Sequence, residues 1–348
     1  MSETLRDVTG RLLSLLAIVA TTLVIAGSAS AAPAPSLPSH IYAPYFETWT
    51  TDSITTTAQV AGARYFTLAF LETLGKSSCT LAWNGSKTDT VAAGRYLSDI
   101  ASLRTIGGDV FPSFGGWSAD QGGTEIADSC TDVNAIASAY ESVITTYDVK
   151  RLDMDVEGRS LNRADGIDRR NKAIKLVEDW AAAQGRTLQI SYTLPTTPRG
   201  LESTGVAILQ NAIANGARVD VVNIMTFDYY DRVTTDMGAA AISAAQGLFS
   251  QLKTLYPSKT DAEIWAMEGN TILPGVDDYP RKTEVTYLTD AQRLYDFARS
   301  VGINTLSIWA IQRDNGGCPG TTDSNSCSGI AQNPWDFSLI LEPFTASR

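Results

Sequence analysis

The stretch Leu152-Asp153-Met154-Asp155-Val156-Glu157-Gly158 places acidic residues at alternate positions of an otherwise apolar segment. In a β-strand, Asp153, Asp155 and Glu157 point to one face, and the apolar residues between them point to the other. Carboxyl groups stacked on a buried face must share protons or find hydrogen-bond donors, and this crowding raises the pKa of at least one of them. Such a group can serve as a general acid near neutral pH.

The same spacing also fits an edge strand with a solvated acidic face, such as a calcium site. The surrounding sequence favours a buried strand, because nearly continuous apolar runs, typical of parallel strands covered on both faces, alternate with amphipathic segments. The acidic stretch is the fourth of eight such runs. The expected strands cover residues 41–45, 65–70, 110–114, 151–156, 188–194, 219–227, 263–267 and 305–311, and the expected helices cover residues 91–106, 132–147, 169–184, 204–215, 238–256 and 289–301.

This alternation predicts an α/β fold, a closed (β/α)8 or TIM barrel that spans residues 41–348 as one domain. Active sites of such barrels lie at the C-terminal ends of the strands, which is where Glu157 falls. An open doubly wound sheet is the alternative, but no G-x-G-x-x-G motif follows the first strand. Between the last two strands, a loop at residues 269–280 and one helix leave no room for an inserted α+β domain.

The N-terminus has the pattern of an export signal. An apolar stretch at residues 12–26 is too short to span a bilayer comfortably, and Ala29-Ser30-Ala31 fits a signal-peptidase site. We expect residues 1–31 to be a cleaved signal peptide, residues 32–40 to be a Pro-rich leader, and the protein to be secreted, without membrane association after cleavage. An uncleaved signal anchor is the alternative, because acidic residues offset the positive charge of the first segment.

Charge and cysteine content narrow the chemistry. The net charge of −11 argues against nucleic acid or an anionic membrane as partner. The only histidine, His40, lies before the first strand, which argues against a Ser-His-Asp enzyme. The sequence contains no C-x-x-C pair, which argues against a metal site. We expect no metal, no cofactor and a monomer. In an exported protein, Cys318 and Cys327 can pair across their short loop, and Cys79 and Cys130 would then form a second disulfide.

Other strands carry motifs that accompany the acidic stretch. Ser113-Phe114-Gly115-Gly116 ends the third strand, Met225-Thr226-Phe227-Asp228 lies on the sixth, and Trp309 lies on the eighth. With Asp153, Asp155 and Glu157, these segments resemble glycoside hydrolase family 18, whose fourth strand reads D-x-x-D-x-D-x-E and whose other signatures are S-x-G-G and M-x-Y-D. The chain departs from the family pattern at Lys150, where the first Asp is expected, and at Phe227, where Tyr is usual. Taken singly, the glycines, Met225, Phe227 and the tryptophans also fit ordinary turns and core packing.

The resemblance implies a substrate-assisted mechanism in which the substrate's own N-acetyl carbonyl attacks the anomeric carbon. Glu157 would protonate the leaving oxygen and then activate water, Asp155 would hold the acetamido N–H, and Asp153 would support Asp155 from deeper in the barrel. Sugar-contacting residues are expected to be Met225, Asp228, Tyr229, Trp309 and Trp117.

The expected function is therefore that of a secreted, endo-acting chitinase that cleaves β-1,4-N-acetylglucosamine linkages. The alternatives are an endo-β-N-acetylglucosaminidase acting on N-glycans, which would use the same acidic stretch, and a non-catalytic chitin-binding barrel. Because the acid Glu157 is present, the sequence favours an enzyme.

Overall fold

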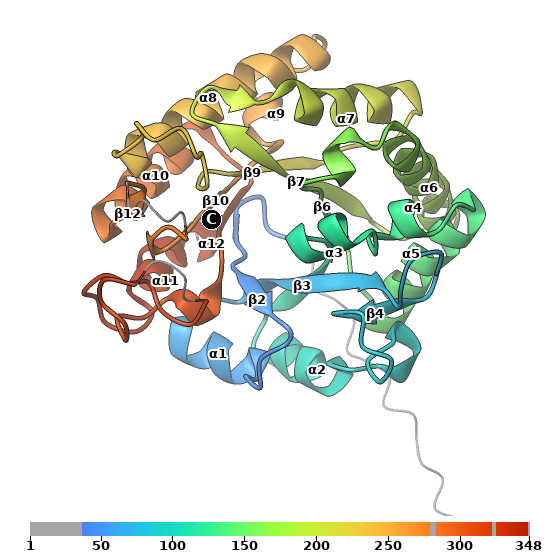
Figure 1. Cartoon of the computed structure of the whole chain (residues 1–348), viewed down its shortest axis with the longest axis horizontal. Helices are drawn as coiled ribbons and strands as arrows, with labels where there is room; N and C mark the ends of the chain where they lie inside the picture. The colour runs from blue at the N-terminus through green and yellow to red at the C-terminus, as the bar shows by residue number, and fades with distance from the viewer. Residues whose placement is uncertain (1–36, 279–282, 322–324, 347–348) are drawn as a thin grey trace, which may run out of the picture. The chain divides into compact units, whose positions relative to one another are not determined.

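A computed structural model describes residues 37–278, 283–321 and 325–346. Its main sheet is parallel along the path β1-β13-β10-β9-β7-β6-β5-β3-β2 (Figure 1). The strands on this path are β1 (Ile41–Tyr42), β2 (Tyr45–Glu47), β3 (Tyr65–Thr73), β5 (Asp109–Gly115), β6 (Arg151–Asp155), β7 (Gln189–Thr197), β9 (Val221–Met225), β10 (Glu268–Ile272) and β13 (Thr305–Ile308). Two short strands, β4 (Leu81–Trp83) and β8 (Gly200–Leu201), add antiparallel partners to β3 and β7.

The sheet closes because its two ends are two halves of one bent strand. β1 pairs with the last strand, β13, whereas β2 pairs with β3. The Ala43 N–H donates to Leu306 O at 2.9 Å, and the Thr67 N–H donates to Pro44 O at 3.0 Å. The segment 41–47 therefore joins the first and last strands, and the predicted (β/α)8 barrel is confirmed.

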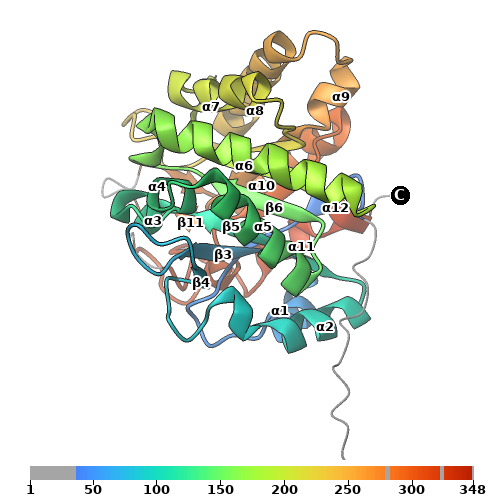
Figure 2. The same ribbon diagram turned by 90° about the vertical axis from the view of Figure 1, so that its right-hand side faces the viewer.

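Helices surround the strands in both ribbon views (Figures 1 and 2). The apolar face of the sheet packs on them in one large core, which includes the fully buried Phe66, Leu152, Ile190, Ile224 and Leu306. No helix in the described part of the chain has the length and apolar content to cross a bilayer. The longer helices are α1 (Ile54–Ala61), α2 (Leu97–Thr105), α5 (Val133–Tyr147), α6 (Ala164–Ala183), α7 (Ser203–Ala214), α8 (Met237–Leu255) and α10 (Leu288–Val301); short ones are α3 (Trp117–Gly122), α4 (Ile126–Ser129), α9 (Asp261–Trp265), α11 (Asp336–Leu341) and α12 (Pro343–Ala346).

The strand expected at residues 263–267 is wrong. The segment Asp261–Trp265 is helix α9, which begins with a capping box between Thr260 and Glu263. The strand follows at β10 and contains Glu268, Gly269 and Asn270, so its polar composition hid it from the apolar-run criterion. Part of the loop expected at residues 269–280 is therefore strand.

The prediction that no α+β domain is inserted between the last two strands is confirmed for the described residues. Between β10 and β13 they form a two-stranded antiparallel ribbon, β11 (Gly275–Val276) with β12 (Val285–Thr286), followed by α10. Other boundaries differ. The helix expected at residues 91–106 is divided, because Gly94 and Tyr96 have φ of 68° and 71°, and α1 was not anticipated.

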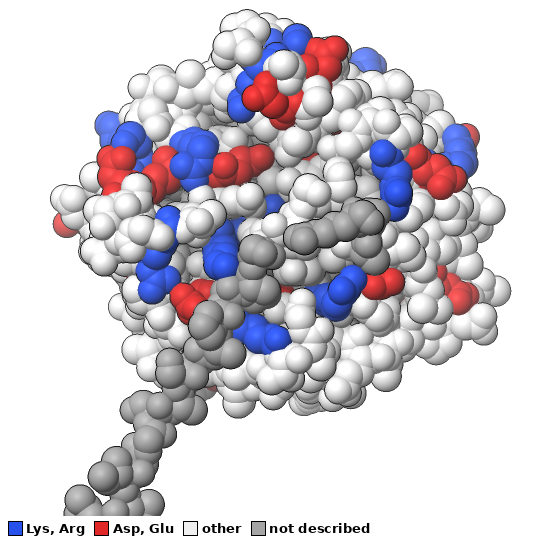
Figure 3. Space-filling model, turned by 180° about the vertical axis from the view of Figure 1, so that it is seen from behind, with Lys and Arg blue, Asp and Glu red and all other residues white. Residues whose placement is uncertain are grey.

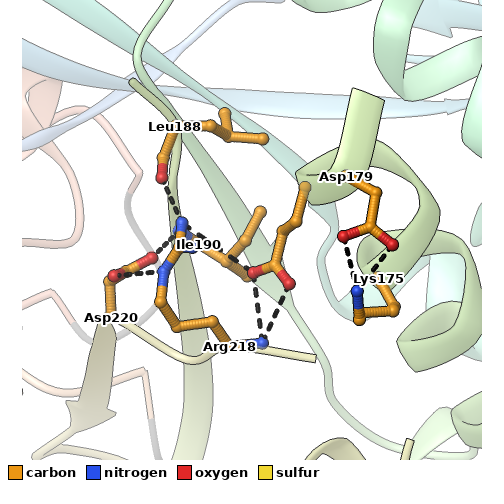
Figure 4. Close-up of polar contacts among 7 residues, drawn as sticks. Lys175, Asp179, Leu188, Ile190, Arg218 and Asp220 are labelled. Carbon is orange, nitrogen blue, oxygen red and sulfur yellow. Dashed lines mark hydrogen bonds and ion pairs between the residues drawn. The ribbon is translucent and has the colours of Figure 1, made fainter. Parts of the chain in front are cut away.

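Polar contacts at the N-terminal ends of β7 and β9 fix the entry of both strands into the barrel (Figure 4). The Arg218 guanidinium donates to Asp220 at 2.8 Å, and the Asp220 carboxylate accepts the Ile190 N–H at 2.8 Å. Glu178 of α6 accepts the Arg218 N–H with both oxygens at 3.1 Å. These contacts help set the β7–β9 register, which places Thr193 opposite Asn223 inside the barrel.

Charged residues on the outer helices are mixed in sign. On α6, Arg169 pairs with Asp165 at 3.0 Å and Lys172 with Asp168 at 2.6 Å. Figure 3 shows Lys and Arg interspersed with Asp and Glu on the face that lies behind Figure 1.

Both expected disulfides are confirmed. Cys79–Cys130 and Cys318–Cys327 have Cα–Cα distances of 4.8 Å and 5.9 Å, and their sequence separations are 51 and 9. Because a disulfide stabilises mainly by restricting the unfolded chain, the longer loop matters more. We expect the Cys79→Ala/Cys130→Ala variant to lose about 4 kcal/mol of unfolding free energy and the Cys318→Ala/Cys327→Ala variant about 2.5 kcal/mol. Denaturant unfolding of both variants measures this, and equal losses would contradict it.

Glu268 of β10 predicts alkaline destabilisation of the fold. It is fully buried, and neither carboxyl oxygen has a hydrogen-bond partner within the described structure. Burial raises its pKa to about 9, whereas an unfolded Glu titrates at about 4.3. Between these values the folded state holds a proton that the unfolded state has released. The folded state therefore loses up to about 1.4 kcal/mol of stability per pH unit as pH rises through this window, and nothing below it.

We therefore expect Glu268→Gln to raise Tm relative to the unsubstituted protein at pH 8 but much less at pH 4. Thermal unfolding at both pH values measures the difference, with Asp296→Asn on the exposed face of α10 as control. If Glu268→Gln changed Tm by the same amount at both pH values, the folded protein would not hold Glu268 in its protonated form.

Candidate active site

The acidic stretch lies inside the barrel. β6 pairs with β5 on one side and β7 on the other, so it is no edge strand, and the solvated-edge alternative is wrong. Asp153 and Asp155 are 3% and 2% exposed, and Glu157, just past the strand end, is half-buried. The intervening Leu152 and Met154 face the outer core, as the alternation predicted.

Asp153 is the deepest of the three carboxyl groups and the best satisfied. Its Oδ2 accepts hydrogen bonds from Ser113 Oγ at 2.7 Å and from Tyr45 Oη at 2.9 Å. Its Oδ1 accepts from Thr193 Oγ1 at 2.8 Å. Burial raises the pKa of Asp153, and the surrounding hydroxyl donors oppose that rise. Strands β2, β5 and β7 thus hold this carboxyl group rigidly beneath the site.

Asp155 differs because its Oδ1 is buried without a hydrogen-bond partner among the residues described. Burial raises its pKa well above the ordinary value, and the carboxyl groups of Glu157, Asp153 and Asp120 raise it further. An unsatisfied buried oxygen beside other acids is unfavourable in an isolated protein. A ligand N–H placed there would remove that cost.

Glu157 has the titration behaviour of a general acid. Burial raises its pKa to about 7, the charge of Asp278 adds to the rise, and the Trp117 backbone N–H opposes it. At neutral pH a substantial fraction of Glu157 is protonated, and the group can both give and take a proton.

Asp155 and Glu157, but not the deeper Asp153, line a cavity of about 920 Å³ at the C-terminal ends of the strands. Each sugar-contacting residue expected from the sequence lines it. Trp117 is 60% exposed beside Glu157, and Trp309 stacks on Phe70 with ring centroids 5.5 Å apart and planes at 15°. Such exposed and stacked aromatic faces suit the apolar faces of sugar rings. The expected residues that line the cavity are Asp155, Glu157, Met225, Asp228, Tyr229, Trp309 and Trp117.

Asp228 follows β9 at a left-handed φ of 52° and forms part of an acidic group with Asp277 and Asp278. Carboxylate oxygens of all three lie within 4.8 Å of one another. Burial, reinforced by the two neighbouring acids, raises the Asp228 pKa to about 11. A carboxyl group with this pKa carries a proton at neutral pH and can donate a hydrogen bond. Glu284 holds the adjoining turn by accepting the Tyr229 N–H at 3.0 Å.

Several site residues escaped sequence reasoning. Tyr45 and Phe70 belong to apolar runs that predict only strands, and Asp278 lies in a segment read as loop. Trp49, 47% exposed, was not among the residues expected to contact sugar, yet it lines the cavity, and its ring centroid lies 6.2 Å from that of Trp309. Asp120 gave no signal, because α3 was not expected at all.

The remaining tryptophans and the two departures from the family pattern lie in different places. Trp83 is fully buried and Trp265 packs on the core, so both are packing residues. Phe227 lines the cavity within an apolar cluster with Met225. Lys150 directly precedes β6, at the opposite end of the strand from Glu157.

Comparison with known proteins identifies the family of this chain. The sequence profile described as Glycosyl hydrolases family 18 matches residues 41–286. The chain is 36% identical over 327 residues to a probable bifunctional chitinase/lysozyme of Escherichia coli strain K12, over 90% of this chain and 35% of that protein. It is 35% identical over 292 residues to endochitinase 11 of Metarhizium anisopliae, over 81% of this chain and 54% of that protein.

Among solved structures, active domain 2 of the chitinase from Pyrococcus furiosus matches with a TM-score of 0.79 and 32% identity, over 90% of this chain and 97% of that chain. This chain belongs to family 18 of the glycosyl hydrolases. It is a chitinase-like member of that family, and it spans 35% and 54% of the length of the two curated relatives.

Proposed function

We propose that this chain hydrolyses β-1,4 linkages between N-acetylglucosamine units of chitin by the substrate-assisted, retaining mechanism. The observation that carries the proposal is the pairing of an unsatisfied buried acid, Asp155, with a carboxyl group of pKa about 7, Glu157, at the wall of an aromatic-lined cavity.

In the first step, protonated Glu157 gives its proton to the glycosidic oxygen while the substrate's acetamido carbonyl oxygen attacks the anomeric carbon. The bond to the leaving sugar breaks, and a cyclic oxazolinium ion forms. Asp155 accepts the acetamido N–H with its unpartnered oxygen and stabilises the positive charge that develops there. Ionised Glu157 then takes a proton from water, whose oxygen opens the ring with net retention.

The environment of each residue supports these roles. The hydroxyl groups of Ser113 and Thr193 hold the Asp153 carboxylate in place beneath Asp155. We propose that protonated Asp228, which also lines the cavity, donates a hydrogen bond to the acetamido oxygen. Phe227 supplies no hydroxyl, and Tyr229, whose hydroxyl is buried and whose side chain lines the cavity, is the donor we propose in its place.

We propose that the enzyme cuts within chains. The described residues between β10 and β13 provide only the β11–β12 ribbon and α10, which are too few to build a tall wall beside the cavity. A polymer can then enter sideways and leave after one cut. We expect a mixture of oligomers with rapid viscosity loss on soluble chitin. Nearly pure disaccharide from the earliest times, with slow viscosity loss, would contradict endo action.

One comparison of substrates distinguishes a chitinase from the two alternatives, an endo-β-N-acetylglucosaminidase and a non-catalytic chitin-binding barrel. Release of soluble oligosaccharides from chitin supports the proposal. Cleavage of a glycoprotein N-glycan core, with chitin left intact, would instead identify an endo-β-N-acetylglucosaminidase. Binding of chito-oligosaccharides without release of any product would identify a lectin-like barrel.

We also propose secretion. The expected signal peptide, residues 1–31, and most of the expected leader lie outside the described residues; of the leader, Leu37 packs beside Ile41 and His40 hydrogen-bonds Ile303 O at 2.7 Å. The two disulfides support an oxidising destination. N-terminal sequencing of the exported protein is expected to begin at Ala32, and an intact N-terminus would favour a membrane anchor.

A further inference from the structure

Asp120 approaches the acidic stretch from a neighbouring part of the barrel. It lies on α3, which starts directly after β5, and it is 1% exposed. Its Oδ2 accepts the main-chain N–H of Glu157. Its Oδ1 has no hydrogen-bond partner within the described part of the chain.

The glycine pair before α3 makes this approach possible. A β-carbon on Gly115 would lie 2.2 Å from Asp155 O and 3.4 Å from Asp120 Oδ1, and Gly115 has a φ of 98°. A side chain at this position would push α3 away from β6. The S-x-G-G segment therefore lets a carboxyl group from α3 reach the backbone of Glu157.

Charged side chains from several neighbouring elements surround Asp120. Asp155 and Glu157 face it from β6 and the residues that follow, Glu125 from the start of α4, and Arg170 from α6. Glu125 and Arg170 form a buried ion pair at 2.9 Å. Burial raises the Asp120 pKa well above its ordinary value, the charge of Glu125 raises it further, and the Glu157 N–H opposes the rise.

We infer that Asp120 is a positioning residue for the catalytic acid: its carboxyl group holds the Glu157 backbone so that the Glu157 side chain stands over the scissile bond, and its proximity couples it to Asp155. This inference rests on the proposed function. Asp120 does not touch substrate, because it is buried behind Glu157 and is absent from the cavity lining.

The test compares Asp120→Ala with Asp120→Asn on a soluble chito-oligosaccharide. Alanine removes the acceptor and leaves the Glu157 N–H unsatisfied, so the acid loses its fixed position. Misplacement by about 1 Å can cost about 10²-fold in rate, and we expect a loss of kcat of that order with little change in KM. Asparagine keeps an oxygen acceptor, so we expect most of kcat to return.

The pH profile of kcat provides a readout that a merely structural role would not move. Asparagine removes a titratable acid that raises the Asp155 pKa. The coupled acids then ionise more readily, so the alkaline limb of the Asp120→Asn profile should shift to lower pH. The matched control is Asp314→Asn. Asp314 is also fully buried and accepts backbone N–H groups, from Phe337 and Ser338, but it serves α11. This control should keep the unsubstituted pH profile.

Wild-type kcat in Asp120→Ala, or an Asp120→Asn profile identical to that of the unsubstituted protein, would overturn the inference. If Asp120→Ala unfolds, the pH profile of Asp120→Asn decides alone. An unsubstituted protein that cleaves no chito-oligosaccharide would instead refute the proposed function, and the inference with it.

Discussion

We expect Glu157→Gln to abolish hydrolysis of chito-oligosaccharides while oligosaccharide binding and Tm stay close to those of the unsubstituted protein. The amide keeps the shape and hydrogen-bonding capacity of the side chain but has no proton to transfer. Loss of general acid–base catalysis costs about 10²–10⁴-fold in rate. In the unsubstituted protein, kcat should fall as pH rises through about 7, because burial raises the pKa of the acid that must be protonated to about that value.

Steady-state kinetics of Glu157→Gln, with Glu141→Gln on the outer helix α5 as control, measure this effect. The control should keep full activity. A Glu157→Gln variant with more than about a tenth of the original turnover would remove Glu157 from the role of general acid, because that loss is below the range for such catalysis.

Asp155→Asn should have the second-largest effect, and Asp153→Asn a smaller one. Asp155 has an unpartnered oxygen where we propose that the acetamido group binds, and asparagine lacks the negative charge with which ionised Asp155 would stabilise an oxazolinium ion. Removing one such electrostatic contact costs about 10²–10³-fold in kcat. Asp153 acts from beneath, and its hydroxyl donors can still hydrogen-bond the asparagine oxygen.

The two variants are compared by kcat on the same substrate, with Asp109→Asn at the far end of β5 as the control for a buried acid outside the site. Asp109 pairs with Arg104, so this control reports on stability alone. Equal activity of Asp155→Asn, Asp153→Asn and the unsubstituted protein would reduce the acidic stretch to a structural feature.

The barrel and its acidic strand β6 could be predicted from the sequence because both depend on local periodicity. Alternating acids on a short apolar strand predicted one inward column, and the structure places Asp153 and Asp155 there. β10 was misplaced for the converse reason: Glu268, Asn270 and Thr271 are polar yet fully buried, and Asn270 and Thr271 accept hydrogen bonds from Thr226 and Asn223 in and just after β9. A criterion based on apolar runs cannot find such a strand.

The parts of the site that depend on tertiary contacts were not predictable. Asp120 on α3 meets the Glu157 backbone only in the folded chain, and Asp278, which lies 50 residues after Asp228 in the sequence, joins it in the acidic group. The raised pKa values have the same origin, since burial and neighbouring acids from several elements cause them. Sequence spacing indicates which acids share a strand, but not which other acids the barrel brings against them.

The substrate-assisted mechanism is tested by the anomeric configuration of the first product released from chitohexaose, followed by NMR before mutarotation. Attack by the substrate's acetamido group followed by water gives net retention, so the new reducing end should appear first as the β-anomer. An initial α-anomer would show that water attacks the anomeric carbon directly, and it would contradict the roles assigned here to Asp155 and Glu157.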